Sequence, residues 1–221
     1  GMAVILKIMH LIMYMAPIGL GCYFADTVGQ VGGQIFSGYL HAFLLYLVLA
    51  FICYFILYPF YIWLSGGRRA FLSYLKNIIT PSLTAIATSS SSACIPVNID
   101  AAKKMGVPGS ISETVIPLGT NMHKDGSVMG GVIKIVFILT IFGQNTGVPH
   151  NAFSVIGVAL LVGAVMGAIP SGGMTGELLI CSVFGFSSQL AATLMVISTI
   201  IDVPATLLNS TGNIVSSVIV T

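Results

Sequence analysis

Residues 117–127 place three ionisable side chains in a row inside apolar sequence. They read Pro-Leu-Gly-Thr-Asn-Met-His-Lys-Asp-Gly-Ser, with His123, Lys124 and Asp125 at the centre and Gly126 beside them. A charged side chain inside a membrane costs about 3 kcal/mol even on the lowest scale, and such residues face a cavity or a partner. The flanking segments are too short to span a bilayer separately. The stretch therefore predicts a broken membrane helix with a substrate or ion site at the break. A short water-exposed loop between two helices is the alternative.

The composition places this chain in a membrane. Of its 221 residues, 56% are hydrophobic and only 6% are charged, whereas a soluble domain carries about 25% charged residues. The net charge of +2 and the lack of a basic patch give no support for a nucleic-acid partner. The four cysteines form no Cys-x-x-Cys pair, so no metal site, disulfide framework or cofactor is indicated. We expect an all-α, multi-pass integral membrane protein in contact with the lipid bilayer.

Gly-, Pro- and Ser-rich breaks divide the chain into spans and half-length arms. The first tip reads Ser89-Ser90-Ser91-Ser92, and the second, residues 167–173, reads Gly-Ala-Ile-Pro-Ser-Gly-Gly. Non-helical backbone at membrane depth is tolerated only where it is buried in protein or lines a cavity, so each tip predicts a re-entrant hairpin. The expected segments are a first helix at 1–33, a spanning helix from 34, a hairpin at 70–105, a broken helix at 110–143, a second hairpin at 152–186 and a second broken helix at 189–221.

The order of hairpin and broken helix occurs twice along the chain. Asp125 lies in the first expected break, and Asp202, close to Pro204, lies in the second. Paired segments interrupted by Gly or Pro are typical of the binding site of a secondary transporter. All six Lys and Arg residues from Lys7 to Lys104 fall on one side of this topology. Because positive loops stay in the cytoplasm, we expect the first hairpin to open to the cytoplasm and the second to face outward.

Four motifs are similar to those of the dicarboxylate/amino acid:cation symporters, the glutamate-transporter family. The serine-rich first tip resembles the tip of the family's first hairpin, and residues 117–127 resemble its Asn-Met-Asp-Gly-Thr region. Residues 168–173 resemble the second tip, and residues 202–213 resemble the eighth helix. The resemblance runs from about residue 15 to the last residue. The family's first four spans have no counterpart here, so the chain is similar to the family's C-terminal portion.

This resemblance implies a fold and a mechanism. The family forms homotrimers in which a transport domain slides like an elevator against a fixed scaffold. Residues 1–33 would be a scaffold-type helix, and residues 34–221 would be the transport domain of an elevator-type transporter. That domain would hold two re-entrant hairpins and two discontinuous transmembrane helices. The implied function is symport of a small-molecule substrate, without enzymatic activity, in a membrane that we expect to be the bacterial inner membrane.

The family's functional positions carry over onto two groups of residues. Asp202 matches the residue that pairs with the amino group of the substrate. The substrate-binding group is Ser90, Ser91, Ser92, Ile169, Pro170, Ser171, Gly172, Asp202, Thr206 and Asn209. The group expected to couple a cation or a proton is Asn121, His123, Lys124, Asp125, Asn209 and Asn213.

The chain departs from the family where acidic substrates are held. In carriers of acidic amino acids, an arginine binds the side-chain carboxylate as a bidentate pair. Its place in the last helix is Ala205 here, and its alternative place in the first tip is Ser89. These residues favour a small neutral amino acid as substrate. Alternatively, Lys124 binds the carboxylate as a point charge and dicarboxylate recognition survives.

The expected cation sites differ from the family as well. In an ungapped alignment, the asparagine of the motif becomes His123 and its methionine becomes Lys124. Asn213 replaces a carboxylate of the last helix, and Met166 replaces a hydroxyl ligand of the second hairpin. Because sodium prefers hard oxygen ligands, at least three of its binding features lack their usual chemistry. The coupling ion could therefore be Na⁺ or H⁺.

We expect a positive side chain to stand in for the bound sodium ion. Lys124, paired with Asp125 or Asp202, is the expected substitute. Histidine changes its charge near neutral pH, which makes His123 a candidate proton carrier. Glu177, alone in the outer arm of the second hairpin, is another candidate.

Three alternatives remain open. If the alignment slips by one or two residues, Asn121-Met122 is the true Asn-Met pair and one sodium ligand survives. The corresponding alternative function is a sodium-coupled symporter of dicarboxylates or acidic amino acids of the usual family type. An intramembrane serine hydrolase could pair Ser91 with His123 or Lys124, although the chain has no Gly-x-Ser-x-Gly turn. A channel would show conductance without saturable uptake. Outside these sites, we expect Lys134 to snorkel toward the outer interface.

Overall fold

The computed structural model describes a helical protein. The described residues are 33–142, 152–168, 172–188 and 190–221, together with Ile18, Gly21, Cys22, Ala25 and Gly29. Every regular element within them is a helix, which confirms the all-α class. The first helix expected at 1–33 lies almost entirely outside the described residues.

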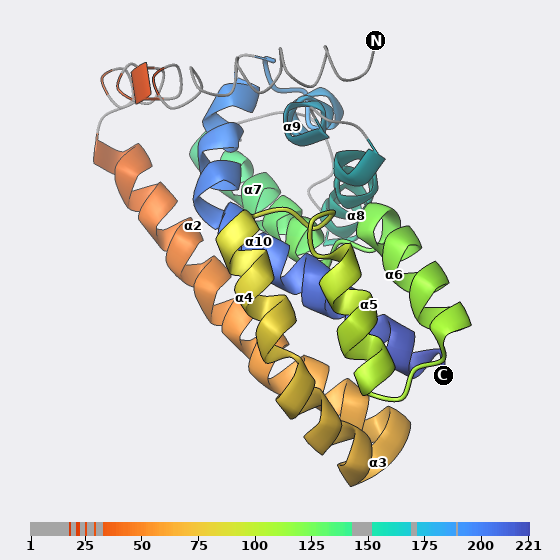
Figure 1. Ribbon diagram of the computed structural model, residues 1–221. Helices are drawn as coiled ribbons and strands as arrows, with labels where there is room; N and C mark the ends of the chain where they lie inside the picture. Colours follow the sequence, from red (N-terminus) through yellow and green to blue (C-terminus); the bar gives the residue numbers. More distant parts are fainter. Residues whose placement is uncertain are drawn as a thin grey trace.

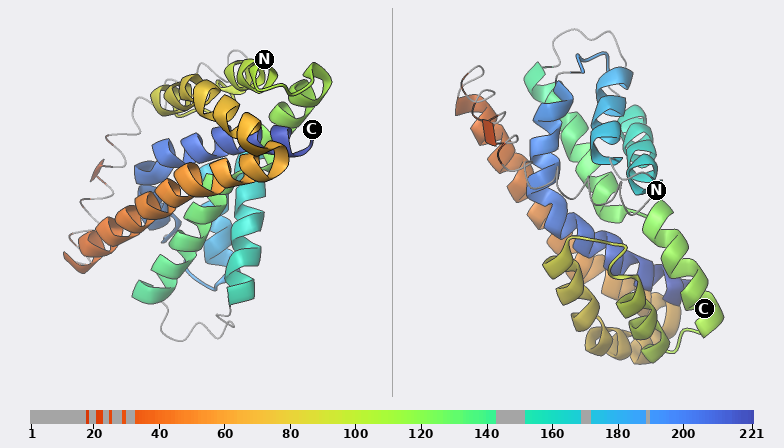
Figure 2. Two further views of the ribbon diagram at one scale, coloured as in Figure 1. Left: turned by 90° about the horizontal axis from the view of Figure 1, so that it is seen from below. Right: turned by 45° about the horizontal axis from the view of Figure 1, so that its top comes forward.

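The described helices are α2 (Gly33–Ile52), the π-helical turn η1 (Cys53–Leu57), α3 (Tyr58–Asn77), α4 (Ile79–Thr88), α5 (Ile95–Lys104), α6 (Gly109–Met122), α7 (Asp125–Phe142), α8 (Ala152–Ala168), α9 (Gly172–Val183) and α10 (Leu190–Ile219). In Figure 1, α7, α8 and α9 gather in the upper part of the molecule, and α3, α4 and α5 in the lower part. The right-hand view of Figure 2 shows the same division. Helix α10 runs through both parts and packs against α2, α3, α4, α5, α6, α7 and α9. The protein is therefore organised around its last helix.

The first described helices form a long apolar rod. The helical stretch Ser37–Asn77 covers 41 residues, and with Leu190–Ile219 it is one of two described stretches long and apolar enough to cross a bilayer. Large apolar side chains such as Phe51 and Phe55 are more than half exposed along it, which suits a lipid-facing surface. The rod kinks at Gly67, whose φ of 62° and ψ of −157° are not helical. A positive φ is accessible to glycine because it has no β-carbon.

Two pairs of short helices follow the kink. Helices α4 and α5 have 10 residues each, whereas α8 has 17 and α9 has 12. A spanning helix needs about 20 residues, so α4, α5 and α9 are too short to cross a bilayer singly. Helix α4 packs against α5, and α8 packs against α9. These pairs have the helix–tip–helix form of the expected hairpins, and their re-entry into the membrane remains a prediction.

The break expected within residues 110–143 is present. Helix α6 ends at Met122, His123 is extended with φ −108° and ψ 97°, and α7 begins at Asp125. The start of α7 lies directly on α10: a β-carbon added to Gly126 would lie 2.7 Å from Ala205 Cα and would overlap the Ala205 carbonyl oxygen. Glycine is thus required at position 126 for this close approach.

The second expected break is wrong, because α10 is one continuous helix of 30 residues with Pro204 inside it. A proline removes one backbone donor and bends a helix without necessarily ending it. Figures 1 and 2 show that α10 changes direction along its length. The polar residues that follow do not disrupt the helix. Thr211 Oγ1 donates to the Leu207 carbonyl within the same helix, and Asn209 bonds to a neighbouring helix instead of its own backbone.

Candidate functional site

The expected site residues of α10 form one stripe. Positions 202, 206, 209 and 213 recur at three- and four-residue spacing, which places them on one face of a helix. Asp202 is exposed, whereas Thr206, Asn209 and Asn213 are buried. The stripe faces the break between α6 and α7, because Asn213 contacts His123 and Asn209 contacts Ser127. The structure thus brings together the two segments that the sequence marks as functional.

His123 connects the break to this stripe. Its Nε2 lies 3.0 Å from Asp125 Oδ1, and its Nδ1 lies 3.3 Å from Asn213 Oδ1. Neutral imidazole has one donor and one acceptor nitrogen, while the protonated ring has two donors. Both ring nitrogens of His123 thus have a polar side-chain partner. His123 therefore lies between two positions that the resemblance assigns to cation binding.

The second carboxylate oxygen of Asp125 also has a protein partner. The Tyr58 hydroxyl lies 2.7 Å from Asp125 Oδ2 and 3.1 Å from the Leu208 carbonyl oxygen. Gly212 gives these groups room, since a β-carbon there would lie 2.8 Å from the Tyr58 hydroxyl and would overlap Asp125 Oδ2. Both oxygens of Asp125 are thus held by protein side chains.

Lys124 is joined electrostatically to an acid of another helix. It interacts with Asp202 of α10, although the two do not form a direct ion pair. Of the two expected partners, Asp202 is therefore favoured, because Asp125 is occupied by His123. The Lys124 side chain also passes the end of α8: a β-carbon on Gly167 would lie 3.1 Å from Lys124 Cε.

Asn209 is fixed by a reciprocal pair of hydrogen bonds. The Ser127 backbone N–H donates to Asn209 Oδ1 over 3.2 Å, and Asn209 Nδ2 donates to Ser127 Oγ over 3.0 Å. Asn121 points elsewhere, because its side chain is exposed and donates to the Pro117 carbonyl of its own helix. Of the expected coupling residues, Asn121 is thus the one that the structure does not bring to the stripe.

The serine-rich tip lies beside the middle of α10 in Figure 1 and in the right-hand view of Figure 2. Ser89 ends α4 in the left-handed conformation with φ 47°. The Ser90 hydroxyl accepts a hydrogen bond from the Ala93 N–H over 3.3 Å, so Ser90 shapes the tip. Within the described part of the chain, the hydroxyls of Ser91 and Ser92 make no hydrogen bond. Those two hydroxyls are available to a ligand.

Three of the four expected site residues of the second tip fall outside the described residues. Ile169, Pro170 and Ser171 are among the residues not described, and Gly172 is the first residue of α9. Met166, which replaces a hydroxyl ligand, packs inside the hairpin, where a β-carbon on Gly176 would lie 3.1 Å from Met166 Cγ. The substrate contacts expected of this tip therefore remain predictions.

One expectation outside the break is wrong. Lys134 does not snorkel to an interface, since it is 1% exposed. Its partner is Glu177, whose Oε1 lies 2.7 Å from Lys134 Nζ, and the role of Glu177 as a proton carrier stays a prediction. The two residues form a buried ion pair between α7 and α9.

Sequence reasoning also missed three residues of the site. Tyr46 donates to the Gly126 carbonyl over 3.0 Å, Tyr58 contacts Asp125, and Ser127 holds Asn209. Tyr46 and Tyr58 are 0% and 3% exposed. Hydroxyl-bearing aromatic residues inside an apolar span were the available signal, since a buried tyrosine needs a hydrogen-bond partner.

Paired short helices, a discontinuous helix and ionisable residues at its break are together the features of a secondary transporter. Comparison of the sequence with known families identifies the family within this class. It matches the Sodium:dicarboxylate symporter family over residues 1–221. The chain belongs to this family, and the family resemblance is confirmed.

Curated relatives agree with this assignment. The serine/threonine transporter SstT of Acinetobacter baylyi is 31% identical over 217 residues, which cover 94% of this chain and 53% of that protein. The proton/sodium-glutamate symport protein of Bacillus subtilis is 28% identical over 214 residues, which cover 96% of this chain and 49% of that protein. The chain thus spans about half the length of these relatives. Their names describe transporters, which fits the expectation of a non-enzymatic role.

Proposed function

We propose that this chain is the substrate- and ion-binding part of a secondary active transporter for a small amino acid or dicarboxylate. It would work by an elevator mechanism with altered or absent sodium coupling. The observation that carries this proposal is the position of His123 between Asp125 and Asn213. Family membership supports the transport activity, and the geometry of the break supports the change in coupling.

Protein side chains already contact the oxygen atoms that a cation at the break would need. A sodium ion at the break would need the Asp125 carboxylate, yet His123 and Tyr58 hold its two oxygens. When protonated, His123 would supply the positive charge that the cation would supply. Because histidine gains and loses a proton between about pH 5 and 8, the site is suited to proton coupling, or to exchange without an ion.

Lys124 and Asp202 support a small neutral amino acid as the substrate. An amino acid zwitterion carries a carboxylate and an ammonium on one carbon, and these two residues carry the opposite charges and interact electrostatically. Lys124 is half-buried and Asp202 is exposed, so both keep surface toward a ligand. Ala205 is buried and apolar, and it gives no anchor for a third charge. A small neutral amino acid is therefore favoured, and the relative named as a serine/threonine transporter agrees.

The usual sodium-coupled carrier of dicarboxylates or acidic amino acids is the second candidate. The family name and the glutamate symporter among the relatives favour it. In that case, Lys124 would bind the substrate's second carboxylate and Asp202 its amino group.

The remaining features of the proposal come from the resemblance and from the charge pattern. The whole protein would form a homotrimer, with the first hairpin open to the cytoplasm and the second facing outward. The bacterial relatives support a place in the bacterial inner membrane.

Uptake into liposomes tests the proposal. The intact protein would be reconstituted and given radiolabelled serine, threonine, alanine, aspartate, glutamate or succinate. Each substrate would be measured in sodium and in choline buffer, with and without an imposed pH gradient. Uptake of a neutral amino acid driven by the pH gradient in choline is expected. Strictly sodium-dependent uptake of glutamate or succinate would establish the second candidate instead.

A further inference from the structure

A buried polar cluster joins three helices away from the break. Lys134 of α7 donates to Glu177 Oε1 of α9 over 2.7 Å and to Ser198 Oγ of α10 over 2.9 Å. The Ser198 hydroxyl in turn donates to Glu177 Oε1 over 2.5 Å. The side chains of Lys134 and Glu177 are 2% and 0% exposed. We call these three residues the Lys134 cluster.

The Glu177 carboxylate keeps one oxygen unused in this cluster. Glu177 Oε2 is buried and has no hydrogen-bond partner among the described residues. A carboxylate beside a hydroxyl is an oxygen set of the kind that hard cations bind. Here the Lys134 ammonium occupies the place of the cation.

In the described helices packed against α9, no other positive group lies beside this carboxylate. Helix α8, which packs against α9, contains no ionisable residue. Cys181 of α9 interacts electrostatically with Glu177 but brings no positive charge. The ionisable residue of α10 is Asp202, one turn beyond Ser198. The charge balance of the cluster thus depends on Lys134.

The cluster also fixes the two helices that carry the candidate site. Lys134 lies on the helix that starts at Asp125, and Ser198 lies one turn before Asp202. Separating α9 from these helices would leave a buried charge without its partner, which is strongly unfavourable.

We infer that Lys134 is a built-in cation for an oxygen site made by Glu177 and Ser198. It lets α9 dock on α7 and α10 without a bound metal ion. Lys134 and Glu177 are then positioning residues, and removing the lysine should turn the site into one that takes up a proton or a small cation. This inference is independent of the proposed transport activity.

Thermal unfolding of the intact protein in detergent tests the inference. Lys134→Met should lower Tm by about 10 °C at mildly alkaline pH, because Glu177 is left as an unpaired buried carboxylate. Mildly acidic pH, or sodium chloride in place of choline chloride, should restore part of that loss. Wild-type protein should show neither response. The double variant Lys134→Met/Glu177→Leu should unfold above the single variant and lose the pH and sodium responses, since no charge remains.

A matched control is Lys103→Met, which removes the lysine of an exposed ion pair with Glu113. It should leave Tm unchanged, because exposed pairs contribute little. An unchanged Tm in Lys134→Met would overturn the inference. A decrease in the Tm of Lys134→Met that neither acidic pH, sodium nor the second substitution reverses would also overturn it.

If Lys134→Met does not fold, Glu177→Gln provides the test. This variant removes the acceptor charge, and its Tm should decrease in a way that acidic pH does not restore. A Glu177→Gln protein with wild-type Tm would equally refute the inference.

Discussion

His123 and Asp125 are in contact within the break between α6 and α7, with Nε2 3.0 Å from Oδ1. Lys124 lies between the two residues in the sequence, and it interacts electrostatically with Asp202 of α10. The proposed function gives these residues two roles. His123 and Asp125 would take part in coupling, and Lys124 and Asp202 would bind the substrate.

Replacing His123 with asparagine tests the proposed role of this residue in coupling. Asparagine restores the residue that the family motif has at this position. Uptake driven by an imposed pH gradient in choline buffer should fall by about 10-fold in His123→Asn, because the variant loses the ring that contacts Asp125 and could carry a proton. Uptake by the variant should also depend more on sodium. Initial uptake rates with and without the pH gradient, in sodium and in choline buffer, measure both effects.

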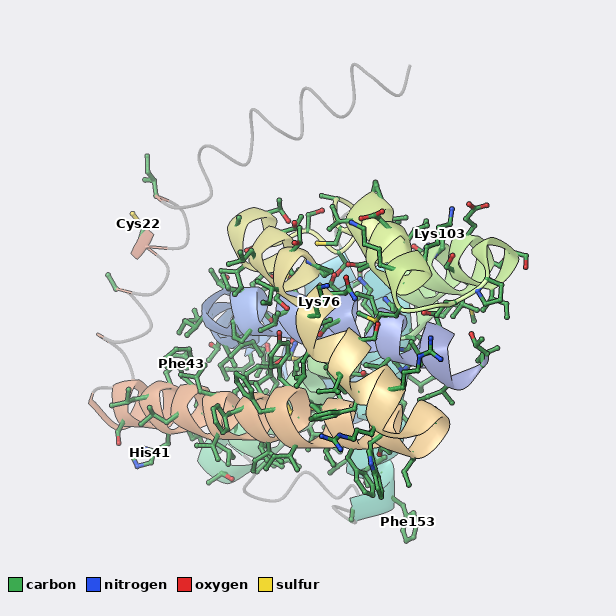
Figure 3. All side chains as sticks on the ribbon, turned by 60° about the horizontal axis from the view of Figure 1, so that its bottom comes forward. Cys22, His41, Phe43, Lys76, Lys103 and Phe153 are labelled. Atoms are coloured by element: carbon green, nitrogen blue, oxygen red, sulfur yellow. The ribbon has the colours of Figure 1, made fainter. Side chains whose placement is uncertain are left out.

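His41 provides the control for this experiment. It lies on the outer side of α2 (Figure 3), exposed, with its ring nitrogen 2.6 Å from the Ser37 carbonyl oxygen. His41→Asn should keep the wild-type response to the pH gradient. Identical responses of all three proteins would contradict a role of His123 in coupling.

Replacing Lys124 with methionine tests the proposed role of this residue in substrate binding. The variant removes the positive charge that faces Asp202 and keeps the length of the side chain. Substrate affinity should fall by about 10-fold, since a charged contact to a carboxylate is lost. Lys103→Met is again the control, because Lys103 lies at the edge of the molecule (Figure 3) and pairs with exposed Glu113. If uptake and ion dependence in Lys124→Met match the wild type, Lys124 has no part in substrate binding or coupling.

Sequence alone predicted the features that depend on local composition. Ionisable residues beside Gly126 marked the break in the helix, and serine or glycine-rich tips between half-length apolar arms marked both hairpins. The resemblance to the symporter family followed from the order of these motifs, and it is confirmed over the whole chain. These signals are strong because charge and broken backbone are costly in a membrane.

The features that sequence missed depend on packing between helices. Pro204 suggested a break, but the surrounding helices hold α10 as one bent helix. Lys134 and Glu177 lie 43 residues apart, and no periodicity in the chain indicates that they meet. The position of Tyr58 depends on the π-helical turn Cys53–Leu57. This turn takes up extra residues and brings Tyr58 toward the buried face that carries Tyr46.

Tyr58→Phe should weaken the packing of the long rod against the site. The Tyr58 hydroxyl bonds to a carboxylate in a buried place, and its loss should lower the free energy of unfolding by about 2 kcal/mol. Thermal unfolding in detergent measures the change. Tyr61→Phe is the matched control, since Tyr61 is 43% exposed on the same helix and should show little effect. Equal Tm values for the two variants would argue against the Tyr58–Asp125 hydrogen bond.

Gly126→Ala sets helix propensity against packing. Alanine stabilises a helix interior by about 1 kcal/mol relative to glycine. Its β-carbon at this position would lie 2.7 Å from Ala205 Cα, and overpacking of this kind costs about 1–3 kcal/mol or more. We therefore expect packing to dominate, with a lower Tm and a loss of uptake as α7 moves off α10. Gly157→Ala on α8 is the control, because an added β-carbon there meets no atom within 4 Å. That variant should be as stable as the wild type or more so, and a Gly126→Ala protein that behaves the same way would refute the close contact between α7 and α10.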